Sequence, residues 1–179
     1  KLCNSLRTQY GFDAISLMPT NLYGSGDNYR ESDSHVLAAL ISKFVKAKYK
    51  RDDKVVCWGT GLVYREFLHV DDLGDACCFA LESWDPNSPD APRKKNDEIL
   101  DYINVGTGID LTIKDLALLI KKIVNFQGEI EWDLSKPDGT PKKQLNISRI
   151  KQIGWSPNIS LEDGINMTIK EYEKIFLNL

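Results

Sequence analysis

The segment SLMPTNLYGSGDNYRESDSH, residues 16–35, places polar and small residues after an apolar run and ends on one of the chain's two histidines. Imidazole titrates near neutral pH, so His35 could donate or accept a proton in catalysis. Asn21 offers both a hydrogen-bond donor and an acceptor, and Gly24 and Gly26 would let the backbone approach a ligand closely. An ordinary surface loop explains the same residues, so both interpretations stay open at this point.

A second set of side chains could hold a dianionic, nucleotide-linked ligand. Arg65 follows a glycine-containing turn and Lys143 ends the segment KPDGTPKK, so the two cations could hold a pyrophosphate. Trp58 ends an apolar run before a glycine turn and could pack on a base or a ribose. Asp138 could accept hydrogen bonds from a sugar or a base. Each also has a structural alternative: a rim or core aromatic for Trp58, and a turn residue for Asp138.

Hydrophobic periodicity predicts the elements that would position these side chains. We expect helices over residues 1–11, 34–50, 71–83, 112–124 and 160–176, and strands over 13–18, 54–58, 65–70, 101–105 and 129–133. Ser34 would cap the second helix and place His35 in its first turn. His69, within a strand, would only pack and hydrogen-bond.

The alternation of strands and helices indicates an α/β fold with right-handed crossovers. In open α/β sheets, ligands lie outside the carboxyl ends of the strands, which is where residues 19–24 would stand. The first strand would be buried, as in a parallel sheet. The last helix, strand, loop and helix could form a small α/β lobe beside the sheet. Residues 84–98 are expected to be an exposed loop.

The composition limits the class of protein. The chain has 179 residues, of which 42% are apolar, enough for one domain or for a domain and a fragment of another. A net charge of −3 argues against a nucleic-acid surface, and the apolar run VLAALI is far shorter than the roughly 18 residues of a membrane span. The four cysteines match no zinc or C-x-x-C pattern, so we expect reduced, mostly buried thiols, a cytoplasmic protein and no metal site.

A series of motifs in fixed order carries a resemblance over nearly the whole chain. They are MPTNLYG with the following DN, SHV, VVCWGTG, REFLHVDD, INVGTG and SKPDGTPKK. In this order they resemble the GDP-L-fucose synthases, GDP-4-keto-6-deoxymannose 3,5-epimerase/4-reductases of the extended short-chain dehydrogenase/reductase group. REFLHVDD and INVGTG alone would specify only the broader NAD-dependent epimerase/dehydratase superfamily. Ser25 and Gly26 replace the more usual Pro-His, at a point where no catalytic role is carried.

This resemblance implies a cofactor, a substrate and their contacts. Members bind NADP(H), epimerise a GDP-linked ketosugar at C3 and C5, and reduce the C4 ketone. The residues that match the nicotinamide side of the cofactor site are Pro19, Thr20, Asn21, Leu22 and His35, and His35 also matches the epimerisation acid/base. The residues that match substrate contacts are Asn21, Lys43, Trp58, Arg65, Asp138 and Lys143. Lys43 stands where some members carry arginine. The partners implied are a GDP-sugar and a second copy of the full-length protein, with neither nucleic acid nor membrane.

The sequence contains no G-x-x-G-x-x-G phosphate loop and no Tyr-x-x-x-Lys pair, and it begins at Lys1 inside an expected helix. We therefore expect a C-terminal portion of the Rossmann-type fold, inactive by itself. Residues 1–110 would be the end of the NADP-binding domain with interleaved substrate-lobe segments, and 111–179 mainly the substrate-binding lobe. Two alternatives stay open: another nucleotide-sugar epimerase, dehydratase or reductase of the superfamily, and a non-catalytic nucleotide-sugar-binding half of a split protein.

Overall fold

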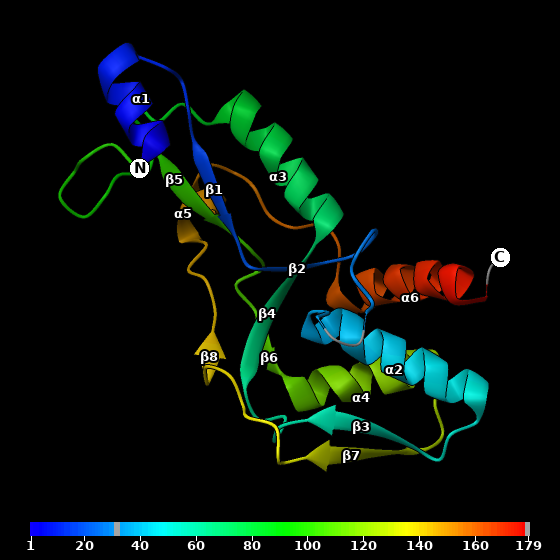
Figure 1. Ribbon diagram of the computed structural model, residues 1–179. Coiled ribbons are helices and arrows are strands. Elements are labelled where there is room, and N and C mark those ends of the chain that lie inside the picture. The colour runs from blue at the N-terminus through cyan, green and yellow to red at the C-terminus, as the bar shows by residue number, and fades with distance from the viewer. Residues whose placement is uncertain (31–32, 178–179) are drawn as a thin grey trace.

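Strand β4, Tyr64–His69, connects the two ends of the molecule (Figure 1). Neighbouring side chains on a strand face opposite sides. Accordingly, Phe67 packs in one hydrophobic cluster and Leu68 in the other. The computed structural model describes residues 1–30 and 33–177, and its α/β class agrees with the alternating pattern of the sequence.

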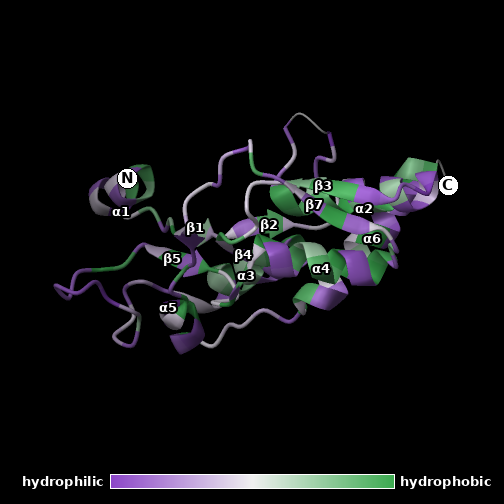
Figure 2. Cartoon of the chain, turned by 90° about the horizontal axis from the view of Figure 1, so that it is seen from below, coloured by the Kyte–Doolittle hydropathy of each residue, from purple (hydrophilic) through white to green (hydrophobic). Residues whose placement is uncertain are grey.

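The hydrophobic cluster that contains Leu68 lies around two parallel strands. Strand β1 (Ser16–Pro19) pairs with β5 (Tyr102–Val105), with Ser16 opposite Tyr102 and Pro19 opposite Val105. Helix α3 (Val70–Ser83) and the short helix α5 (Ser148–Gln152) contribute buried apolar residues here, among them Ala76, Ala80 and Ile150. Helix α1 (Leu2–Tyr10) contributes no buried residue and lies at the end of the molecule (Figure 2). It ends at Gly11, whose φ of 63° is the left-handed conformation that a helix stop favours.

The hydrophobic cluster that contains Phe67 lies between a layer of three helices and two parallel strands. Its helices are α2 (Val36–Lys50), α4 (Ile113–Val124) and α6 (Leu161–Leu177), and its strands are β3 (Lys54–Trp58) and β7 (Glu129–Asp133). Helix α4 is amphipathic, with Leu116 and Ile120 fully buried. Thr112 caps it by accepting a hydrogen bond from the backbone N–H of Asp115.

Three short strands extend the sheet around β4. Strand β2 (Asn21–Tyr23) and strand β8 (Lys142–Lys143) pair with it in parallel, and β6 (Asp110–Thr112) pairs antiparallel. The sequence predicted none of these three, nor α5, because two or three residues are too few for a periodicity. Tertiary hydrogen bonds to β4 define the strands instead.

The first strand also differs from the prediction. It spans 16–19 rather than 13–18, and β2 follows after one residue where a loop was expected. It is not a buried strand either, since Met18 is 52% exposed and Pro19 is exposed. In the part of the chain that the structure describes, β1 pairs only with β5, so its other edge has no partner strand.

The start of helix α2 differs from the prediction. Helix α2 begins at Val36 with His35 as its N-cap, so Ser34 is not the cap and His35 does not lie in the first turn. His69 caps α3 by accepting from the N–H of Asp71 at 3.2 Å, a structural role in line with the expectation for this buried side chain.

All four cysteines are free, but only Cys57 is buried. Cys77 and Cys78 lie exposed on α3, contrary to the prediction of mostly buried thiols.

Candidate functional site

Trp58 stands at the centre of the candidate site because it ends β3 and leaves its indole 59% exposed. The ammonium group of Lys43, on α2, lies 5.1 Å from the ring centroid and donates to the Val56 carbonyl at 2.8 Å. Lys136 lies 5.4 Å from the same ring. An exposed aromatic ring with two cations close to it suits a ligand that combines a planar ring with negative charge.

Arg65 lies on β4, on the same side of the site as Trp58. Its guanidinium donates at 2.6 Å to the Tyr64 carbonyl and at 2.6 Å to the Thr140 carbonyl. Lys143 is its cross-strand partner on β8. The pairing fixes both cations on neighbouring strands. An arginine fork and a lysine placed together favour phosphate oxygens.

Asp138 closes the site from the loop between β7 and β8. Its carboxylate accepts from the backbone N–H of Thr60 at 2.9 Å and from the Thr60 hydroxyl at 2.6 Å. These hydrogen bonds stabilise the ionised form and lower the pKa of the carboxyl below its usual value. A β-carbon at Gly59, whose φ is 76°, would collide with the Asp138 carboxylate, so this turn requires glycine.

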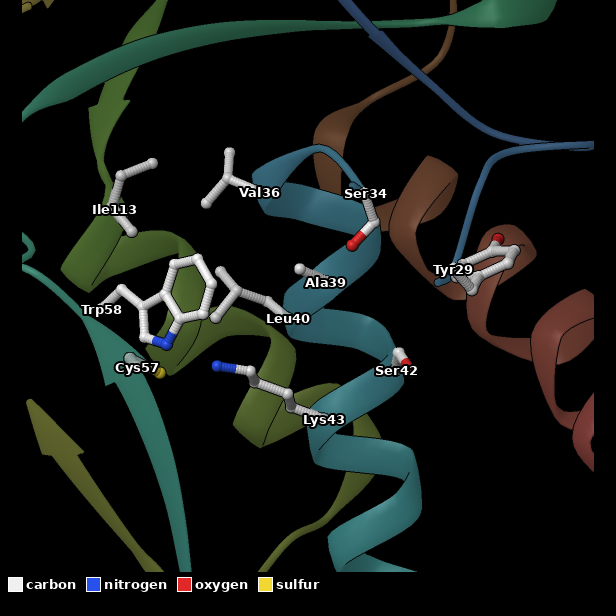
Figure 3. A pocket seen from close by; sticks show the side chains of 10 residues that line it. All are labelled: Tyr29, Ser34, Val36, Ala39, Leu40, Ser42, Lys43, Cys57, Trp58 and Ile113. Carbon is white, nitrogen blue, oxygen red and sulfur yellow. The ribbon is translucent and has the colours of Figure 1, made fainter. Parts of the chain in front are cut away.

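Two cavities share Trp58, Val36 and Ile113 in their walls. One, of about 210 Å³, is lined on one side of α2 by Lys43, Cys57 and Trp58, and on the other by Tyr29 (Figure 3). The other, of about 170 Å³, is lined by residues that include Trp58, Arg65, Pro137, Asp138 and Gly139. The structure thus brings Lys43, Trp58, Arg65 and Asp138 around one continuous region, with Lys143 on the adjoining strand.

The segment expected on the nicotinamide side is held rigidly at the carboxyl end of β1. The N–H of Thr20 donates to the Val105 carbonyl at 3.0 Å, and its hydroxyl donates to the Glu66 carbonyl at 3.3 Å. The side-chain amide of Asn21 donates to the same carbonyl at 2.7 Å. Pro19 is exposed and Leu22 is half-buried. None of these residues lines the two cavities around Trp58.

His35 lies exposed at the start of α2 and immediately precedes Val36, which lines both cavities. The histidine therefore borders the region without forming its wall. Gly24 behaves differently from the expectation of a ligand contact. A β-carbon there would meet Val70 and His69, so close packing rather than ligand access explains the glycine.

Two further residues, at the site or close to it, do not follow from the sequence pattern. Lys136 lies over Trp58, and no motif of the sequence indicates this place. Glu66 lies within β4, whose alternating sequence predicts only a strand. It is fully buried and its carboxylate accepts three backbone hydrogen bonds. A charged residue between Arg65 and the apolar Phe67 and Leu68 was the available signal, since buried carboxylates require partners.

Two features are absent from the described residues, 1–30 and 33–177. In that part of the chain no helix is long and apolar enough to cross a membrane. Nor does that part group three or more histidine, cysteine or acidic side chains in a way that could hold a metal ion.

Comparison with protein families gives a match over residues 1–93 to the NAD dependent epimerase/dehydratase family. The chain belongs to this family. It is 46% identical to GDP-L-fucose synthase 1 of Arabidopsis thaliana over 178 residues, which are 99% of this chain and 51% of the relative. It is also 46% identical to GDP-L-fucose synthase of Escherichia coli K12 over 168 residues, 94% of this chain and 51% of the relative.

A solved structure of a GDP-D-glycero-L-gluco-heptose synthase from Campylobacter jejuni, in the presence of NADPH, superposes with a TM-score of 0.77 at 32% identity. The match covers 97% of this chain and 56% of the other. The chain is thus a homologue of GDP-L-fucose synthases and spans about half the length of the curated relatives it matches. Its α/β fold matches about half of a nucleotide-sugar enzyme fold.

Proposed function

We propose that this chain is the C-terminal, substrate-binding part of a GDP-L-fucose synthase. Residues 1–110 would complete a Rossmann-type NADP-binding domain and carry interleaved substrate-lobe segments, and 111–179 would be mainly the substrate lobe. The observation that carries the proposal is the convergence of Trp58, Arg65 and Asp138 on one cavity, in a chain 46% identical to GDP-L-fucose synthases over nearly its whole length.

The nucleotide end of a GDP-sugar fits the region around Trp58. The exposed indole offers a stacking face for guanine. Lys43, Arg65 and Lys143 supply positive charge opposite the diphosphate. Hydrogen bonds with Thr60 favour the ionised carboxylate of Asp138 and lower its pKa below the usual value. Its remaining lone pairs can accept hydrogen bonds from ribose hydroxyls.

His35 would act at the ketosugar. A C–H bond next to a ketone releases a proton to a base when the resulting enolate is stabilised. Return of a proton from the opposite face by an acid inverts the carbon, and His35 would be one member of this acid–base pair at C3 and C5. Its exposed place beside the shared wall residue Val36 leaves the imidazole free to meet a sugar.

The residues at the carboxyl end of β1 fit a nicotinamide. The side chains of Thr20 and Asn21 donate to the Glu66 carbonyl and so fix this segment at the exposed end of β1. The residues that would contact the nicotinamide there are Pro19, Thr20, Asn21 and Leu22. NADPH, when bound, supplies the hydride that reduces C4. This chain would orient the ring, and Asn21 would also face the sugar. The full-length enzyme would be a cytoplasmic homodimer.

The test compares this chain with a full-length protein that contains it. Each is mixed with GDP-4-keto-6-deoxy-D-mannose and NADPH, and the products are identified by chromatography and NMR. We expect GDP-L-fucose and NADPH oxidation only from the full-length protein, and no GDP-L-fucose after His35→Gln. NADPH oxidation by the 179-residue chain alone would contradict its assignment as a part. A different epimerised or reduced sugar would assign the chain to another member of the family.

A further inference from the structure

The Glu66 carboxylate holds two backbone segments, through three N–H groups, in the interior of the molecule. Its side chain is 0% exposed. One carboxylate oxygen, Oε1, accepts from the N–H groups of Thr107 and Gly108 at 2.7 and 2.8 Å, and the other, Oε2, accepts from the N–H of Leu145 at 2.7 Å. A buried carboxylate without such donors would be strongly destabilising, so these contacts are obligatory for this strand.

The segments held by Glu66 belong to opposite ends of the proposed site. Leu145 lies two residues after Lys143, on the phosphate side. The main-chain carbonyl of Glu66 accepts from Thr20 and Asn21, on the nicotinamide side. The turn after β5 closes tightly on the carboxylate, since a β-carbon at Gly106 would collide with Oε1.

Arg65 and its neighbour Tyr64 hold the residues just before β8. Its side chain donates to the Thr140 carbonyl, and the N–H of Tyr64 donates to the Pro141 carbonyl at 2.8 Å. Side chains of consecutive strand residues face opposite ways. Arg65 therefore holds the chain before β8 from the ligand side. Glu66 holds the chain after β8, at Leu145, from the interior.

We propose that Glu66 is a positioning residue that fixes Lys143 against Arg65 for diphosphate binding, an inference that rests on the proposed function. Strand β8 is only two residues long and its lysines are exposed. Pairing with β4 and the anchor at Leu145 hold it in place. Without that anchor, Lys143 would lose its fixed distance to Arg65 and its contribution to affinity, while Lys43, on α2, would keep its own.

The experiment is a calorimetric titration of the chain with GDP, in single and double variants. Glu66→Gln keeps the volume but turns one acceptor into a donor that faces backbone N–H groups. We expect GDP to bind about tenfold more weakly, as for a lost charge-assisted contact. In the Glu66→Gln background, Lys143→Ala should weaken GDP binding no further. Lys43→Ala should weaken it by the same factor as in the unaltered chain.

Asp72 supplies a matched control, because it is another buried carboxylate bound to backbone N–H groups. It accepts from Asn158 at 2.9 Å and from Ile159 at 3.1 Å, and it lines neither cavity around Trp58. Asp72→Asn should lower the melting temperature and leave GDP affinity unchanged. If Glu66→Gln does not fold, Glu66→Asp, which keeps the charge but shortens the reach, should show the same selective loss of the Lys143 effect.

Three results separate the possible outcomes. A Glu66 variant that is less stable but binds GDP as the unaltered chain does would overturn the inference. So would a Lys143→Ala effect that stays fully additive, because Glu66 would then act on stability alone. Failure of the unaltered chain to bind GDP would instead count against the proposed function on which the inference rests.

Discussion

The Asp138 carboxylate bridges the backbone N–H and the hydroxyl of Thr60, at 2.9 and 2.6 Å, across the loops that follow β7 and β3. This contact joins two segments that are far apart in the sequence and places both beside Trp58. The site is therefore built from loops held by hydrogen bonds to one another, and loosening of either loop should be felt at the other.

The Asp138–Thr60 contact predicts a pH dependence. The folded-state pKa of Asp138 lies below the usual 3.8, so its contribution to stability is present above that pH and is lost as the pH falls through the lower folded value. We expect the melting temperature of the unaltered chain to fall more steeply below pH 4 than that of Asp138→Asn. Thermal melts from pH 2.5 to 6 measure this. Parallel curves would show that the carboxylate contributes nothing.

Trp58 should govern affinity for a nucleotide. Removing a base-stacking aromatic ring costs about 1–3 kcal/mol, so Trp58→Ala should weaken GDP binding by roughly ten- to a hundredfold. Trp58→Phe, which keeps a stacking face, should lose much less. Equal losses in both variants, measured by calorimetry, would mean that the indole acts by something other than stacking.

Two glycines in helices should respond oppositely to alanine. A β-carbon at Gly164, in α6, would collide with the Tyr23 hydroxyl and lie 3.0 Å from His69, whereas one at Gly74, in α3, would meet nothing within 4 Å. Overpacking costs about 1–3 kcal/mol, and an exposed helical Gly→Ala gains roughly 1 kcal/mol. Urea unfolding should therefore show Gly164→Ala less stable and Gly74→Ala more stable. Equal behaviour of the two would mean that α6 does not pack as closely as described.

The thiols should separate by reactivity. Burial raises the pKa of Cys57 to about 11, so at pH 8 this thiol is protonated as well as shielded. Cys77 and Cys78 are exposed. A thiol-reactive dye at pH 8 should label these two rapidly and Cys57 only after unfolding, with mass spectrometry identifying each site. Rapid labelling of Cys57 would show that the cavity wall beside Trp58 opens in solution.

The sequence predicted the long elements well because their periodicity is local. Strands β3 and β7 have the expected bounds, and helix α4 ends at Val124 as its spacing indicated. Strand β8 and the anchoring role of Glu66 could not be predicted this way. Both depend on hydrogen bonds between residues about 40 to 80 positions apart, which no local pattern reports.

Candidate site residues follow the same division. Trp58, Arg65 and Asp138 carried a chemical hypothesis from residue type alone, and the fold brings them to one cavity. Lys136 carried none, because its place over Trp58 results from the path of the loop after β7. The cap position of His35 depended on where α2 starts, and helix ends are the part of an element that sequence patterns define least.

The most direct test of the account is a calorimetric titration of the chain with GDP and with UDP, repeated for Arg65→Ala and for Lys174→Ala, an exposed lysine on α6. We predict selective binding of GDP, a loss of affinity of about tenfold or more in Arg65→Ala because charge-assisted hydrogen bonds to phosphate are removed, and no change in Lys174→Ala. Equal affinity for both nucleotides, or GDP binding that Arg65→Ala leaves intact, would contradict it.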